Sequence, residues 1–212
     1  MKKILLSLLI LVSIFAFQLT FSGTIAEAQE SSNSIEIIDG TSLSESELES
    51  IRDNEEYMIE LTYNQALERA AEVSGKSIEE LKIQHPPYSF RNPAACGWLE
   101  TATTLSVRSY RPQLIVIIET CRHGSFGWVT KKQPFLQEFK AGSKKFDGTI
   151  KVDLDNTGYT YVVNGSFYDH GTVSHTGTTG IDAIFTATYA VSYASNWYGS
   201  LYTGLQYKRV IK

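Results

Sequence analysis

The hydrophobic positions follow a helical period in one early stretch of the chain. Between residues 62 and 84 they recur every three or four residues, and they are Ala66, Leu67, Ala70, Ala71, Val73, Ile78 and Leu81. Thr62 with Gln65, and Ser77 with Glu80, have the spacing of capping boxes, and Gly75 stands where a helix should end. The pattern therefore predicts two helices joined by a tight glycine turn. A weaker helix is expected around 45–53.

From Cys96 onward the apolar positions alternate with polar ones, as they do in strands with one buried face. The predicted strands are 99–107, 114–120, 128–130, 135–139, 150–154, 159–168, 184–193 and 197–210. Turn residues separate them at short intervals. We therefore predict an α+β fold, in which a small acidic N-terminal helical segment precedes an antiparallel β-sandwich or barrel.

Residues 1–28 have the layout of a secretory signal peptide. Lys2 and Lys3 precede an apolar run over 4–17, and Ala26-Glu27-Ala28 offers a cleavage site. An uncleaved membrane anchor is the alternative, because the apolar run can be extended to Phe21. We expect a secreted, extracellular protein that begins at Gln29, and the short leader is typical of a bacterial chain.

Charge divides the rest of the chain into two parts. Residues 29–84 contain 14 acidic and 4 basic residues, a net charge of −10, whereas 85–212 contain 8 acidic and 13 basic residues, a net charge of +5. Residues 85–95 begin with His-Pro-Pro and are expected to be an extended linker to a β domain at 96–212. The two parts either attract each other or meet different partners. The acidic part could also be a pro-segment.

The two cysteines, Cys96 and Cys121, are expected to form a disulfide in an exported protein. They flank two predicted strands whose turn lies near Arg108-Ser109, midway between them, so the hairpin would bring both sulfurs to its open end. Such a bridge stabilises by roughly 3 kcal/mol in the chain-entropy model. A Cys121 nucleophile next to His123 is the alternative, but the sequence offers no group to orient it.

Four residues are candidates for ligand binding. Trp197 and Tyr198 are predicted at a hairpin tip, where exposed aromatic rings bind sugars, membranes or proteins, unless they pack inside the sheets. His170 and His175 belong to a glycine-rich segment that reads as a loop. Two imidazoles and Asp169 could bind zinc, but their spacing matches no zinc signature. We therefore assign no metal, no cofactor and no catalytic residue.

These patterns favour a secreted, non-enzymatic binding protein whose basic β domain meets an anionic cell-envelope polymer, a host surface or a membrane. Nucleic acid is disfavoured, because the acidic helices repel phosphate. One alternative is a membrane-active toxin or bacteriocin-like protein. Its C-terminal hairpin, 184–207, alternates small polar residues with aromatic and aliphatic ones, as membrane β-hairpins do. Another alternative is a hydrolase that uses the His170–His175 segment.

Overall fold

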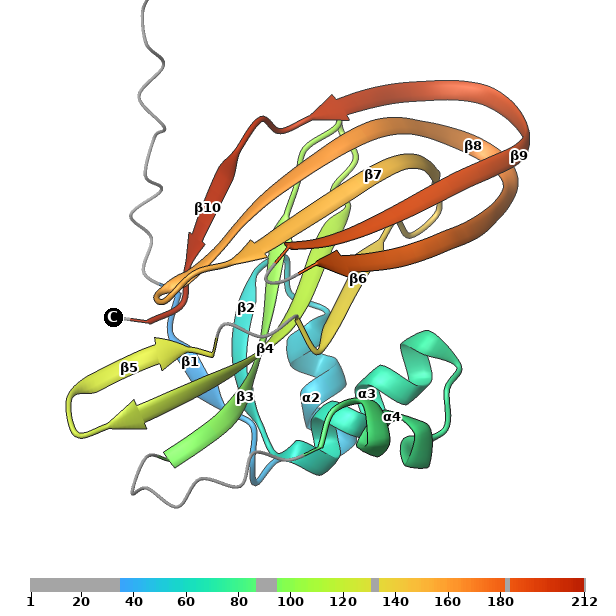
Figure 1. The fold of residues 1–212 in the computed structure, drawn as a ribbon. Coiled ribbons are helices and arrows are strands. Elements are labelled where there is room, and N and C mark those ends of the chain that lie inside the picture. The colour runs from blue at the N-terminus through green and yellow to red at the C-terminus, as the bar shows by residue number, and fades with distance from the viewer. Residues whose placement is uncertain (1–34, 87–94, 131–133, 182–183, 212) are drawn as a thin grey trace, which may run out of the picture. The chain divides into compact units, whose positions relative to one another are not determined.

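The computed structural model describes residues 35–86, 95–130, 134–181 and 184–211, and only the backbone at 175–181, 184–185 and 193–195. The predicted signal peptide, 1–28, and most of the predicted linker lie outside these residues. The described residues form three helices and ten strands in two sheets (Figure 1). The α+β class predicted from the sequence is confirmed.

The first sheet has the order β1-β2-β3-β4-β5, and β6 pairs with β4 beside β5. Its strands are β1 (Ile37–Asp39), β2 (Tyr57–Leu61), β3 (Ala95–Thr104), β4 (Gln113–His123), β5 (Phe126–Val129) and β6 (Leu136–Lys140). Among the pairings described for this sheet, only β1–β2 is parallel. The β3–β4 hairpin is the one that the sequence predicts.

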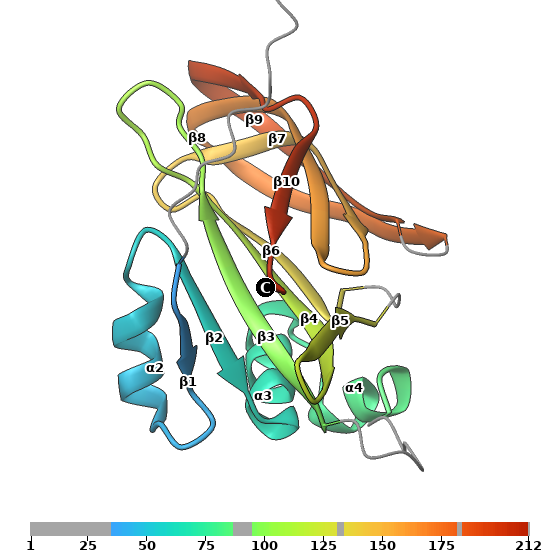
Figure 2. The same cartoon turned by 90° about the vertical axis from the view of Figure 1, so that its left-hand side faces the viewer.

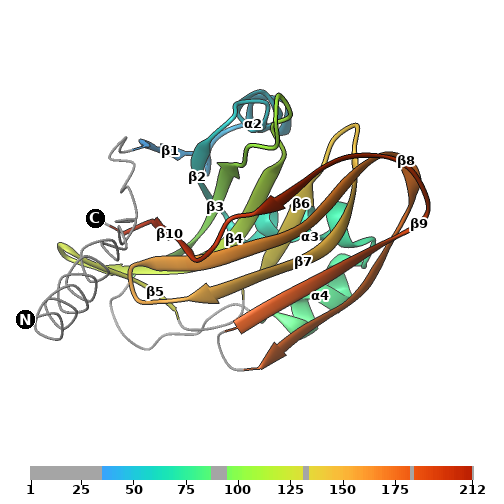
Figure 3. The same cartoon turned by 90° about the horizontal axis from the view of Figure 1, so that it is seen from above.

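The second sheet consists of β7 (Lys145–Leu154), β8 (Gly158–Ile181), β9 (Ile184–Tyr202) and β10 (Gln206–Arg209), in the order β10-β8-β7-β9. The arms β8 and β9 also pair with each other, so this long curved hairpin flanks β7 on both sides (Figure 3). The described strands thus form two sheets. They do not form a single closed barrel, which the sequence analysis gave as the alternative to a sandwich.

Two predictions about the long hairpin are wrong. Residues 170–180, read from their glycines as a loop, belong to strand β8, whose pairing with β9 shifts register at three places. Ser195-Asn196, read as a turn, lies within β9. Asn196 has a positive φ of 54°, and next to it the pairing passes from His170–Ser195 to Tyr168–Trp197. The local signal for a turn therefore bends the strand without ending it.

Three helices cover one face of the first sheet (Figure 2). They are α2 (Glu45–Arg52), α3 (Tyr63–Ser74) and α4 (Ile78–Gln84). Both predicted capping boxes form. The backbone N–H of Gln65 donates to the Thr62 hydroxyl at 3.2 Å, and the backbone N–H of Glu80 donates to the Ser77 hydroxyl at 3.2 Å. Gly75 ends α3 with a φ of 69°, which glycine adopts without strain.

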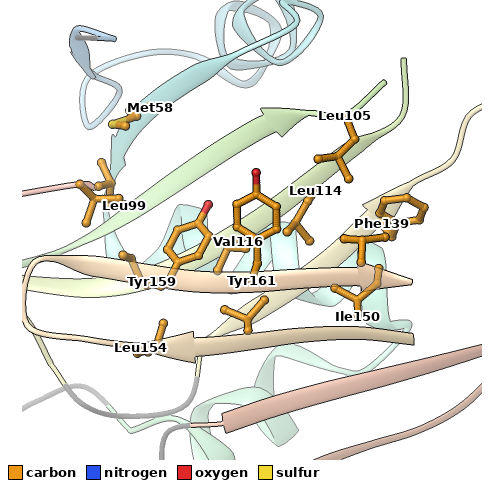
Figure 4. Packing of buried hydrophobic residues seen from close by; sticks show 14 of the residues in the cluster. Met58, Leu99, Leu105, Leu114, Val116, Phe139, Ile150, Leu154, Tyr159 and Tyr161 are labelled. Atoms are coloured by element: carbon orange, nitrogen blue, oxygen red, sulfur yellow. The ribbon is translucent and has the colours of Figure 1, made fainter. Parts of the chain in front are cut away.

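The opposite face of the first sheet shares a hydrophobic core with the second sheet. Met58, Leu99, Val116 and Phe139 of the first sheet belong to one buried cluster with residues of β7 and β8, among them Ile150 and Tyr159 (Figure 4). A second cluster joins the helices to the first sheet, through Leu48, Leu67 and Leu81 on the helix side. The first sheet is therefore buried on both faces.

Strand β2 makes the acidic segment part of this sheet. It lies between β1 and β3, and it pairs with β3 from Tyr57–Ala102 to Leu61–Trp98. The sequence did not predict this strand, because four of its five residues are buried and the alternation of apolar and polar positions is lost. Residues on both sides of the predicted linker thus belong to one compact unit.

Candidate functional site

The turn between β3 and β4 holds an arginine in an unusual backbone conformation. Val107 and Tyr110 exchange backbone hydrogen bonds of 3.0 Å, which leaves Arg108 and Ser109 as the two turn residues. Arg108 has a φ of 57°, in the left-handed region that costs a residue with a Cβ roughly 1–2 kcal/mol. The fold therefore holds Arg108 where glycine would be less strained.

This turn reaches the second sheet, where Arg108 lies against two aromatic rings of β9. The Arg108 guanidinium carbon is 5.2 Å from the centre of the Trp197 ring and 5.6 Å from that of Tyr198. Both distances are within the range of cation–π attraction. Tyr198 is half-buried and contacts the ring of Tyr110 edge-on, whereas Trp197 is 56% exposed. The arrangement leaves much of the indole open to a ligand.

Two further cations belong to this region, one against the Tyr198 ring and one in the turn itself. The Lys144 ammonium lies 4.2 Å from the centre of the Tyr198 ring and 2.5 Å from Oδ1 of Asp169, and this hydrogen bond raises the pKa of Lys144. Arg111 donates from Nη1 to the carbonyl oxygens of Arg108, at 2.9 Å, and Tyr110, at 3.1 Å. We define the Arg108 surface as Arg108, Arg111, Lys144, Trp197 and Tyr198.

The Arg108 surface carries uncompensated positive charge. Asp169 pairs with Lys144, but within the described ranges neither Arg108 nor Arg111 lies within 4.0 Å of a carboxylate. Both arginines are exposed. Guanidinium groups that have no carboxylate partner in the protein can form charge-assisted hydrogen bonds with an anionic ligand.

The structure brings three of the four candidate ligand-binding residues together. Trp197 and Tyr198 lie within β9 and not at a hairpin tip, which corrects that prediction. The exposed His170 lies on the neighbouring strand, where it pairs with Ser195 while Tyr168 pairs with Trp197. The side chain of His175 lies outside the described residues. The sequence treated Arg108 only as part of a turn, and Lys144 was not singled out.

The predicted disulfide is confirmed. Cys96 and Cys121 are direct partners in the β3–β4 register and are joined by a bond of 2.06 Å. They lie at the open end of the hairpin, and the Arg108 turn lies at its closed end. The bridge therefore anchors the strands that carry the turn, from the end remote from the Arg108 surface.

The described residues provide no support for a metal site or for a membrane-spanning helix. Among the side chains that the structure describes, no three His, Cys, Asp or Glu residues are grouped closely enough to hold a metal ion. No helix in the described ranges has the length and apolar character needed to cross a membrane. Comparison of the chain with family models, with curated proteins and with solved structures yields no match.

Proposed function

We propose that this protein is a secreted, non-enzymatic binding module that holds an anionic cell-envelope or host-surface polymer on the Arg108 surface. The observation that carries the proposal is that Arg108, beside the exposed ring of Trp197, and the neighbouring Arg111 are exposed and have no carboxylate partner among the described residues. The cations attract the polymer, and the rings provide contact area at little entropic cost.

The distribution of charge supports one orientation of binding. The helices carry acidic residues such as Glu45, Glu47, Glu79 and Glu80, and they cover the face of the first sheet that points away from the second. An anionic polymer is repelled from the helices and attracted to the Arg108 surface. We also propose that the two sheets form a β-sandwich. The hydrophobic core that they share supports this, because one buried cluster contains residues of both sheets. Val107 of the Arg108 turn belongs to that cluster, and Tyr198 of β9 packs against it.

A matched pair of polymers tests the proposal. Immobilised dextran sulfate should retain the protein at low salt and release it as salt is raised, because screening weakens exposed charge pairs. Uncharged dextran should retain much less. Arg108→Asn should weaken retention, while Lys82→Gln, which removes an exposed cation from α4, should leave it unchanged. Equal retention of both variants would refute the assigned surface, and equal retention on the two polymers would refute the function.

One observation favours a second candidate, insertion of the β8–β9 hairpin into a membrane. From His170 to Tyr207 the sequence has a single formally charged residue, Asp182. The arms have 24 and 19 residues, longer than the roughly 9–11 residues that a membrane-spanning strand requires. Insertion would require β9 to leave β7, to which it is paired.

A cross-link between β7 and β9 tests this candidate. Thr149 and Thr188 face each other in the register, so Thr149→Cys with Thr188→Cys should lock the hairpin in place. The wild-type protein should release dye from anionic vesicles, and the locked protein should not until a reductant is added. Wild-type protein with reductant controls for opening of Cys96–Cys121. Absence of release from wild type, or equal release by the locked form, would eliminate insertion.

A further inference from the structure

We propose that the ligand of the Arg108 surface is an acidic polysaccharide, whose sugar rings stack on Trp197 and Tyr202 while the guanidinium groups pair with its carboxylates. This inference rests on the proposed function and narrows it to one class of polymer. It draws on the exposed rings of β9 and on the uncharged face between them.

The two rings lie on one face of the second sheet. Trp197, Ser200 and Tyr202 pair with Tyr168, Ser166 and Asn164, and direct partners in an antiparallel ladder share a face. The hydrogen bond of 2.9 Å between the Ser166 and Ser200 hydroxyls agrees with this register. Trp197 is 56% and Tyr202 73% exposed. A register shift at Tyr198 places Trp197 opposite Tyr168, which lies four residues from Asn164 on β8. The two rings are therefore about 13 Å apart along the strands, and an extended chain of a few sugars can touch both.

The face between the rings suits sugar hydroxyls. The side chains of Asn164, Ser166 and Ser200 offer amide and hydroxyl groups, and none of them is charged. Such groups can both donate and accept hydrogen bonds, as a hydroxyl-rich polymer requires. A polyphosphate, which has no rings and few hydroxyls, would leave this face unused.

The guanidinium groups lie at one end of this face, beside Trp197, where they can pair with carboxylates of the ligand. The strained turn fixes the backbone of Arg108, and Trp197 and Tyr198 support its guanidinium. A positioned guanidinium loses less freedom when it binds, and its planar fork matches a carboxylate. Arg111, anchored on the carbonyl of Arg108, adds a second such group. A neutral polysaccharide would use the rings but leave both guanidinium groups without an anionic partner.

Titration calorimetry with three probes separates these ligand classes: polygalacturonate, which is acidic and has rings, polyphosphate, which is acidic without rings, and neutral dextran. We expect polygalacturonate to bind most tightly per charge. Trp197→Ala should weaken polygalacturonate binding roughly tenfold and polyphosphate binding by about twofold. Polyphosphate loses only the support that the ring gives to Arg108, whereas the polysaccharide also loses the ring on which a sugar stacks. Trp197→Phe should recover most of the affinity. Arg108→Asn should weaken binding of both acidic polymers.

Phe126→Ala is the matched control, since Phe126 is 79% exposed at the β4–β5 turn and lies outside the Arg108 surface. It should leave all affinities unchanged, and circular dichroism should show each variant folded. If Trp197→Ala weakens both acidic polymers equally, or polyphosphate binds as tightly as polygalacturonate, the polysaccharide assignment fails while the proposed function stands. If no acidic polymer binds, both fail.

Discussion

Two arginines of this protein have opposite surroundings. Arg52, at the end of α2, is 2% exposed and donates to Glu45 at 2.7 Å, to Glu49 at 2.8 Å and to Glu100 through two nitrogens. Arg108 is exposed and contacts aromatic rings, with no carboxylate among the described residues near it. The same side chain thus holds the fold together at one site and is left available at the other.

At the buried site, the charges of Arg52 and Glu100 are paired and hydrogen-bonded within the protein, and this explains why the site is structural. Glu100 of β3 is completely buried and accepts hydrogen bonds from Arg52 and from the hydroxyl of Tyr57 at 2.8 Å. Burial disfavours the charge of Arg52, but the hydrogen bonds and the charge of Glu100 outweigh it, so the pKa of Arg52 is raised. The cluster joins α2 and β2 to β3. It therefore ties the acidic segment to the part of the chain that carries the Arg108 surface.

The largest predicted effect is at Arg52. Arg52→Met leaves the charge of Glu100 buried without its cation, which should lower the free energy of unfolding by about 3–5 kcal/mol. Urea unfolding measured by circular dichroism tests this. Arg108→Met, the same change at the exposed site, serves as the control. A loss below about 1 kcal/mol at Arg52 would show that the two sites do not differ as described.

The disulfide should have the next largest effect, and on stability alone. Replacing Cys96 and Cys121 by alanine should cost roughly 3 kcal/mol, because the open chain of 25 residues regains entropy when it unfolds. Affinity for dextran sulfate should not change under conditions in which the variant is folded, since the bridge lies at the far end of the hairpin from the Arg108 turn. Loss of binding by the folded variant would contradict this separation.

Local signals explain what the sequence could predict. The capping boxes at Thr62 and Ser77 involve residues three positions apart, and the Cys96–Cys121 bridge follows from the symmetry of one hairpin. Asn196 misled the prediction because asparagine tolerates a positive φ both in turns and within an irregular strand. Nothing local distinguishes the two cases; the pairing of β9 with β8 decides.

The Arg108 surface could not be predicted for a related reason. Arg108 comes from a turn of the first sheet, Lys144 from the connection between β6 and β7, and Trp197 from β9. Only the packing of the two sheets brings them together. Trp197 was identified from its residue type and its place beside a turn signal. The cations near it are distant in sequence, where no spacing rule applies.

High pH should lower the free energy of unfolding by a smaller amount than these substitutions, through a buried contact between the two sheets. Tyr159 is fully buried, its hydroxyl lies 2.8 Å from that of Thr101, and burial raises its pKa to about 12. A raised pKa means that the stabilisation is complete below pH 10, the unfolded value, and is lost as pH rises toward 12. Each such tyrosine should lower the free energy of unfolding by about 1 kcal/mol when the pH reaches 11.

Unfolding of wild type and Tyr159→Phe in urea at pH 8 and pH 11 measures this contribution. The phenylalanine variant should lose about 1 kcal/mol less between the two pH values, because it has no hydroxyl to ionise at that position. Tyr207→Phe, at an exposed position on β10, is the matched control and should behave as wild type. Identical losses for all three proteins would show that burial of Tyr159 does not set the pH dependence.

The smallest effect on stability should accompany a clear loss of binding. Arg108→Asn replaces a strained residue by one that tolerates a positive φ, which offsets the loss of the cation–π contacts, so the free energy of unfolding should change by less than about 1 kcal/mol. Affinity for dextran sulfate should nevertheless fall about fivefold or more. A fold that selected Arg108 for stability would show the reverse: a clear loss on unfolding and unchanged binding. Because asparagine fits the turn at least as well, the backbone conformation does not account for an arginine at this position, whereas the proposed binding of an anionic ligand by its guanidinium does.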